Sequence, residues 1–106
     1  MARENNMKRL EVISLRTSAE AEQQALESMR KFCRIVKEHH LSDANFSLSD
    51  ANFYVHGSIP SDLALCISSE VQEGEDMRTD LGCYMADLLK QFGIVDYNSW
   101  LMIEEL

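Results

Sequence analysis

Several residue types are scarce in this sequence, and each shortage excludes a class of protein. One proline and four glycines among 106 residues are too few for a collagen-like or low-complexity chain. No run approaches the roughly 20 apolar residues of a membrane-spanning helix, and residues 1–15 contain no apolar stretch of the signal-peptide type. We therefore expect one cytoplasmic domain, residues 1–106, without a membrane partner.

Basic side chains are almost missing from the second half of the chain. Residues 1–53 carry 8 basic and 8 acidic side chains, whereas residues 54–106 carry 2 basic and 10 acidic ones, so the net charge of −8 lies in the second half. Nucleic acids bind through Lys and Arg side chains that replace the counterions of phosphates. The acidic balance therefore predicts that neither DNA nor RNA is a partner.

Cysteine occurs three times, as Cys33, Cys66 and Cys83, and shows no CxxC or Cys/His spacing of the kind that binds zinc. An odd number of cysteines without a signal peptide favours reduced thiols. Each cysteine has apolar sequence neighbours, which predicts small buried side chains rather than reactive thiols. The glycines are isolated, so there is no phosphate-binding loop, and we expect neither a metal ion nor a cofactor.

The apolar residues that are present recur with periods of two or of 3.6, which indicate strands and helices. The expected elements are a strand at 8–16, a helix from the 17–20 segment to about 40, strands at 51–56 and 63–68, a helix at about 80–92 and a last strand at 99–104. This β-α-β-β-α-β order predicts an α+β protein of ferredoxin-like fold. Its four-stranded antiparallel sheet carries both helices on one face.

Capping residues mark the expected ends of the two helices. The segment 17–20 (TSAE) has the form of a capping box for the first helix. Thr79 or Asp80 is expected to cap the second helix, and Gly93 follows that helix in the context of a left-handed C-cap.

A hexapeptide, LSDANF, occurs twice in tandem, at 41–46 and 48–53. The copies are seven residues apart, so one unbroken strand would point Phe46 and Phe53 to opposite faces. We therefore expect the first copy to form the turn after the helix and the second copy to begin the next strand.

With both helices on one face, the opposite face of the predicted sheet is apolar and uncovered. Tyr54, Cys66, Trp100 and Met102 are expected there, together with part of the first strand. Such a contiguous surface is larger than monomers usually expose. A second copy of the sheet packed over it would cover this surface, which predicts a homodimer with isologous contacts.

The element order resembles that of the dimeric α+β barrel proteins, in particular the antibiotic-biosynthesis-monooxygenase-like domains, in which two such sheets face each other across a cavity. The resemblance covers almost the whole chain and is strongest at 62–70 (DLALCISSE), 81–93 (LGCYMADLLKQFG) and 95–100 (VDYNSW). Active members often carry a Trp just before the acidic residue that closes the third strand, whereas here Ser69 precedes Glu70. Haem-degrading relatives add a His on the second helix, which this chain does not have at 81–92.

A polar and aromatic row, Asn52, Tyr54 and His56, is predicted on the uncovered face. An imidazole two residues from a phenol could orient a phenol or quinol and take up its proton near neutral pH, so His56 and Tyr54 are the catalytic candidates. Alternatively the row is exposed or interfacial, with His56 hydrogen-bonded to the backbone. Trp100 either lines the same cavity or anchors an interface. The candidate ligand-binding residues are Asn52, Tyr54, His56, Cys66 and Trp100.

Two functions remain open from the sequence. In the first, a small dimeric barrel binds an apolar or aromatic small molecule or serves in assembly. In the second, which the resemblance implies, it is a cofactor-independent monooxygenase that acts on an aromatic or polyketide-like compound. An enclosed cavity where Tyr54, His56 or Trp100 converge would favour the enzyme.

Overall fold

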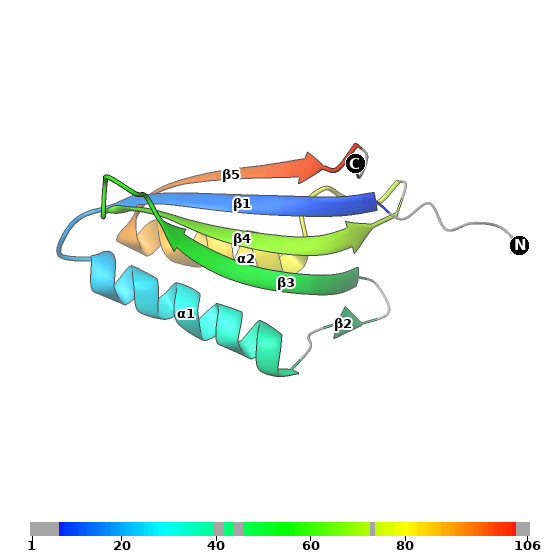
Figure 1. Ribbon diagram of the computed structural model, residues 1–106, viewed down its shortest axis with the longest axis horizontal. Helices are drawn as coiled ribbons and strands as arrows, with labels where there is room; N and C mark the ends of the chain where they lie inside the picture. The colour runs from blue at the N-terminus through cyan, green and yellow to red at the C-terminus, as the bar shows by residue number, and fades with distance from the viewer. Residues whose placement is uncertain (1–6, 40–41, 44–45, 73, 104–106) are drawn as a thin grey trace, which may run out of the picture.

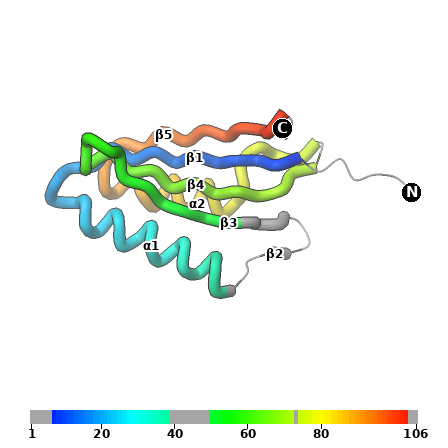
Figure 2. The backbone as a smooth tube through the Cα atoms, viewed as in Figure 1, coloured from blue at the N-terminus to red at the C-terminus, as the bar shows by residue number. Residues whose placement is uncertain are grey.

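The computed structural model describes residues 7–39, 42, 43, 46–72 and 74–103, and of these it gives only the course of the backbone for 39, 42, 43 and 46–49 (Figure 2). Its elements are β1 (Met7–Thr17), α1 (Glu22–His39), β2 (Ser42–Asp43), β3 (Phe46–Val55), β4 (Asp62–Val71), α2 (Asp80–Leu89), the 3-10 turn η1 (Lys90–Phe92) and β5 (Gly93–Leu101). Both helices lie on the same side of the sheet (Figure 1).

The strands form one sheet in the order β2-β3-β4-β1-β5, and each neighbouring pair is antiparallel. The two central positions belong to β4 and β1, which are far apart in the sequence. This arrangement confirms the predicted ferredoxin-like fold, with four long antiparallel strands and two helices on one face. The two-residue β2 is an addition at the edge beside β3 that the sequence pattern did not indicate.

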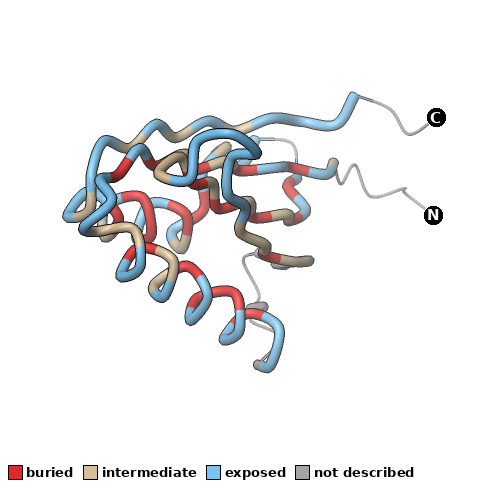
Figure 3. Tube along the Cα trace, turned by 60° about the vertical axis from the view of Figure 1, so that its left-hand side comes forward, coloured by how far each residue is buried: buried red, intermediate tan, exposed pale blue. Residues whose placement is uncertain are grey.

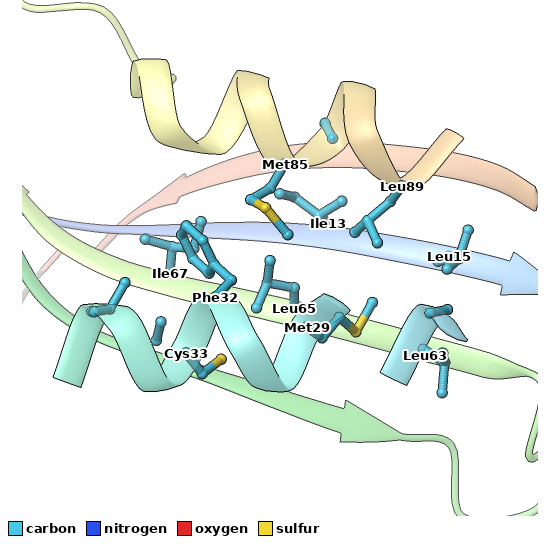
Figure 4. Close-up of a cluster of buried hydrophobic side chains, with 14 residues drawn as sticks. Ile13, Leu15, Met29, Phe32, Cys33, Leu63, Leu65, Ile67, Met85 and Leu89 are labelled. Atoms are coloured by element: carbon cyan, nitrogen blue, oxygen red, sulfur yellow. The ribbon is translucent and has the colours of Figure 1, made fainter. Parts of the chain in front are cut away.

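Side chains alternate between the two faces of the central strands. In β1 the odd-numbered residues from Arg9 to Thr17 are buried, and in β4 so are the odd-numbered residues from Leu63 to Val71. These residues face the helices, whose apolar side chains complete the core, and burial of this apolar surface is the main force that holds the two layers together. Figure 4 shows side chains from both layers pointing toward one another: Ile13, Leu65, Ile67, Met29, Phe32, Met85 and Leu89 among others.

The helix starts are set by hydroxyl side chains. Ser18 Oγ accepts a hydrogen bond from the Ala21 backbone N–H at 3.2 Å, so Ser18 does the work that the capping-box pattern assigned to Thr17. Thr17 is the last residue of β1, and its hydroxyl donates to the Phe92 carbonyl at 2.6 Å instead. Thr79 caps α2, as one of the two expected candidates, by accepting from the Gly82 N–H at 2.9 Å.

Gly93 is not a left-handed cap. It begins β5 in an extended conformation, with φ 161°, and lies so close to β1 that an added Cβ would stand 3.0 Å from the Arg16 carbonyl carbon. The last strand therefore starts six residues earlier than the predicted 99. Its early alternation was hidden because polar Asp96 and Asn98 occupy exposed positions that alternate with the half-buried Val95 and Tyr97.

The tandem repeat falls on the edge of the sheet. The second copy lies in β3 as predicted, with an irregularity in its pairing to β4 between Leu48 and Asp50. The first copy was expected to be a turn, and this is wrong for Ser42 and Asp43, which form β2, and for Phe46, which begins β3 and pairs with Asp43. Residues 41, 44 and 45 lie outside the described part of the chain.

The three thiols differ in their surroundings. Cys33 is buried in the core, Cys66 is half-buried and Cys83 is exposed, and all three are free. The expectation of burial is therefore confirmed for Cys33 and wrong for Cys83. Burial raises the pKa of the Cys33 thiol to about 11.

We expect Cys33 to make the fold sensitive to alkali. The unfolded chain has a thiol pKa of 9.0, below that of the folded chain, so above this pH the unfolded state releases a proton that the folded state keeps. Stability is then lost as the pH rises from about 9 to about 11. Urea unfolding of the wild type and of Cys33→Ala at about pH 8 and about pH 10.5 measures this. The variant should start less stable but lose less stability between the two pH values, and equal losses would contradict the assignment.

Candidate functional site

The face of the sheet that points away from the helices, the open face, carries large apolar side chains in contact with solvent. Trp100 is 60% exposed and Tyr54 54% exposed, and Leu10 and Met102 are exposed beside them. Figure 3 shows β5 as exposed or half-buried along its length. These are the residues that the sequence pattern places on an uncovered surface.

The strand registers arrange the side chains of the open face in rows across the sheet, and three neighbouring rows matter for the site. The middle row consists of Asn52, Cys66, Val12 and Asn98. The hollow row, nearer the β3–β4 turn, consists of Tyr54, Ala64, Ser14 and Asp96. The tryptophan row, toward the other end, consists of Ser68, Leu10 and Trp100.

A hollow of about 520 Å³ lies on the open face at the end next to the β3–β4 turn. A ligand of drug-like size fits a space of this order. The hollow is open to solvent. Its lining includes Arg16, Tyr54, His56, Ala64, Ile94 and Asp96.

His56 stands at the end of β3 and holds the β3–β4 turn. Its ring Nδ1 accepts hydrogen bonds from the backbone N–H groups of Ser58 at 3.0 Å and Ile59 at 3.1 Å. The backbone N–H of His56 donates to the Asp62 carbonyl at 2.8 Å. The backbone-bonded interpretation of His56 is therefore confirmed, and His56 is also one of the residues that line the hollow.

Several polar groups around the hollow form hydrogen bonds with one another. Arg16 Nε donates to Asp62 Oδ1 at 3.3 Å, in an ion pair whose Arg side chain is largely exposed. Asp96 Oδ2 accepts from the Asn98 side-chain amide at 3.1 Å. The Tyr54 hydroxyl makes no hydrogen bond with any described residue, so it remains available to a ligand.

Asn52 and Cys66 are partners in the middle row, but neither is poised for chemistry. Asn52 accepts from the Lys37 ammonium at 2.9 Å and donates to Asp50 at 3.0 Å, so its amide is used in a surface network beside α1. Burial raises the pKa of the Cys66 thiol, which keeps it protonated and weakly nucleophilic at neutral pH.

Trp100 does not converge with Tyr54 and His56 within one protomer. Its row crosses β1 at Leu10, whereas the hollow row crosses at Ser14, and four residues of strand span roughly 13 Å. Trp100 instead neighbours a second, largely apolar hollow of about 560 Å³, which is lined by Lys8, Arg9, Leu10, Ser68, Ser69 and Met102.

A buried polar cluster on the opposite face, beneath α2, was not predicted. Glu11 is fully buried, and its carboxylate accepts from the Thr79 N–H at 2.9 Å, from the Thr79 hydroxyl at 2.9 Å and from the Tyr97 hydroxyl. Burial, reinforced by the hydrogen bond to Glu11, raises the pKa of Tyr97. The carboxylate thus binds the amino end of α2, where partial positive charge gathers.

Arg9 extends this buried cluster toward the connection before α2. Only 4% of Arg9 is exposed, and its guanidinium donates to Ser69 Oγ at 2.9 Å and to the Asp76 carbonyl at 2.7 Å. Extending the alternation of Ile13 and Leu15 backward by two and four residues places Glu11 and Arg9 on the covered face. This alternation could have predicted the burial of Glu11 and Arg9, but charged residues are usually expected to be exposed.

Arg78 covers the outer edge of β5. Its guanidinium donates to the Tyr97 carbonyl at 2.9 Å and lies over the Tyr97 ring, 4.3 Å from the ring centre. Since β5 is the last strand of the sheet, this carbonyl faces away from β1 and would otherwise be free to pair with another strand.

A metal site and a membrane-spanning helix each place requirements on the described part of the chain. Within it, no three His, Cys, Asp or Glu side chains gather as a metal site would require. Neither described helix combines the length and the apolarity that are needed to cross a bilayer.

Comparison with solved structures supports the fold. A conserved protein of unknown function from Bacteroides thetaiotaomicron, named a possible oxidoreductase, is similar to this chain with a TM-score of 0.62 and 12% identity, over 92% of this chain and 99% of that one. An antibiotic biosynthesis monooxygenase is similar with a TM-score of 0.57 and 13% identity, over the same shares. The resemblance in fold is thereby confirmed. No protein-family model and no curated protein sequence matches the chain.

The packing at Gly82 gives a stability test of the buried cluster. A Cβ at this position would collide with the Tyr97 hydroxyl and the Glu11 carboxylate, and would stand 3.1 Å from Glu11 Cδ. We expect Gly82→Ala to lower the free energy of unfolding by roughly 1–3 kcal/mol, measured by urea denaturation.

Gly57 is the matched control, because nothing lies within 4 Å of an added Cβ there. Gly57→Ala should change the stability by less than about 0.5 kcal/mol. Alanine normally favours a helix over glycine, so a stabilised Gly82→Ala protein would show that the cluster does not constrain α2.

Proposed function

We propose that this protein is a small homodimer that packs the open faces of two sheets together and binds an apolar or aromatic small molecule in the hollow beside the β3–β4 turn. The observation that carries the proposal is the hollow of about 520 Å³ on an uncovered sheet face, lined by Tyr54 and His56. A protein of this size has little core of its own, so pairing two such faces adds the apolar burial that one copy lacks.

The hollow supports a small ligand rather than a macromolecule. Its walls combine apolar surface from Val55, Ala64 and Ile94 with a few polar groups, which is the usual composition of small-molecule sites. The Tyr54 ring offers a face for stacking on an aromatic compound. Since all three cysteines are free thiols, we place this activity in the reducing environment of the cytoplasm.

The second candidate function is a cofactor-independent monooxygenase that acts on an aromatic or polyketide-like compound. The names of the two similar structures favour it, as one is a monooxygenase and the other a possible oxidoreductase. Such a reaction would oxidise a phenol with dioxygen to a quinone and water. Consumption of dioxygen with a bound phenol, and its loss in Tyr54→Phe or His56→Asn, would favour catalysis over binding.

Trp100 tests the dimer. Because an exposed aromatic anchor contributes strongly once it is buried at an interface, Trp100→Ala should weaken dimerisation at least about tenfold in sedimentation equilibrium. Tyr84 is the control, since it is 61% exposed but lies on α2, on the covered side of the sheet. Tyr84→Ala should leave the association unchanged. A wild-type protein that stays monomeric at high concentration, or equal effects of both substitutions, would refute the proposal.

Ala64 tests the hollow. It is the third residue of β4 and lines the hollow, and Ser68 lies on the same face of the same strand, four residues or two strand repeats away. Ala64→Phe should fill the hollow and abolish binding of a naphthalene derivative, measured by fluorescence titration. Ser68→Phe adds the same ring outside this hollow and should bind as the wild type does. Unchanged binding in Ala64→Phe would place the ligand elsewhere.

A further inference from the structure

The hydrogen bonds of His56 determine which of its ring nitrogens carries the proton. Nδ1 accepts from two backbone N–H groups, of Ser58 at 3.0 Å and of Ile59 at 3.1 Å. An acceptor nitrogen in a neutral imidazole has no hydrogen, so the proton is on Nε2. Nε2 makes no hydrogen bond with any described residue. His56 is one of the residues that line the hollow. Its free ring group is therefore a hydrogen-bond donor, Nε2–H, and its ring lone pair on Nδ1 is already used by the turn.

The charges around the hollow indicate whether a ligand that accepts the hydrogen bond from His56 is neutral or ionised. Arg16 is the cation of its lining and is paired with Asp62 at 3.3 Å. Asp96 adds a second carboxylate, which the neutral amide of Asn98 contacts without compensating its charge. The lining therefore carries one more negative than positive charge, and this disfavours an anionic ligand.

We infer that the hollow selects a neutral aromatic compound through a carbonyl oxygen that accepts a hydrogen bond from His56 Nε2–H. This inference rests on the proposed function, because it assigns a ligand class to the same hollow. The carbonyl supplies the acceptor that the imidazole requires, and the absence of charge avoids repulsion by Asp96. The aromatic ring lies against Tyr54 and the apolar side chains of Ile94 and Ala64. His56 acts here as a residue that sets specificity.

Four naphthalenes with the same ring test the inference by titration: 2-acetylnaphthalene, 2-naphthol, 2-naphthoate and 2-naphthylamine. The ketone should bind about fivefold or more tightly than the phenol, the carboxylate and the amine, the factor expected for one net hydrogen bond. If none of the four binds, the proposed function fails. If they bind but the phenol, the amine or the carboxylate binds as tightly as the ketone, the inference fails and the hollow remains a site.

Two variants separate the two nitrogens of His56. In His56→Asn the side-chain oxygen can replace Nδ1 as the acceptor of the turn, but no donor reaches the position of Nε2. This variant should keep the stability of the wild type and lose the preference for the ketone. In His56→Gln the longer amide reaches the Nε2 position, so the preference should be retained in part. A preference that survives His56→Asn would overturn the role of His56.

Nitrogen NMR of the imidazole checks the premise without any ligand. In protein labelled with ¹⁵N on histidine, near pH 8, His56 should show an unprotonated Nδ1 and a protonated Nε2. The opposite tautomer would overturn the inference whatever the titrations give, because Nε2 would then be an acceptor.

Discussion

The rest of the architecture depends on one buried carboxylate. Glu11 lies on the central strand β1, and through it β1 is joined to the amino end of α2 at Thr79 and to the edge strand β5 at Tyr97. A carboxylate without partners in the interior would be costly, but here three donors satisfy it and the helix end favours its charge. The same contact explains why α2 must have a glycine at position 82, where no side chain fits.

Fixing α2 in this way also determines what remains uncovered. Both helices are committed to the face that carries Glu11, Ile13 and Leu15, so the even-numbered side chains of β1 and β4 are left to solvent. This one-sided burial creates the open face, and its register places Tyr54 near His56 at one end and Trp100 at the other. The site is thus a consequence of how the core is arranged, and its polar groups are held by the turn and by one another rather than by the core.

The sequence predicts the element order, the sheet and the two faces because these follow from periodicity, which is local. Within these elements, it predicts that Tyr54 and Trp100 share the uncovered face, but their separation along the sheet depends on register between strands far apart in the chain. The sequence pattern does not reveal the early start of β5, because the polar residues Asp96 and Asn98 give the first part of this strand the composition of a loop. Glu11 and Arg9 were missed for the opposite reason, since charged residues are rarely fully buried without partners that only the fold supplies.

The position of Arg78 has a consequence for how copies of this chain can associate. A sheet can grow sideways without limit when its last strand offers free backbone groups, which is the geometry of fibrils. Here a guanidinium already occupies the Tyr97 carbonyl and stacks on its ring in the middle of that border. Lateral addition of a strand would have to displace it, whereas face-to-face contact would leave it undisturbed. One arginine outside the open face therefore disfavours lateral strand addition at the β5 border.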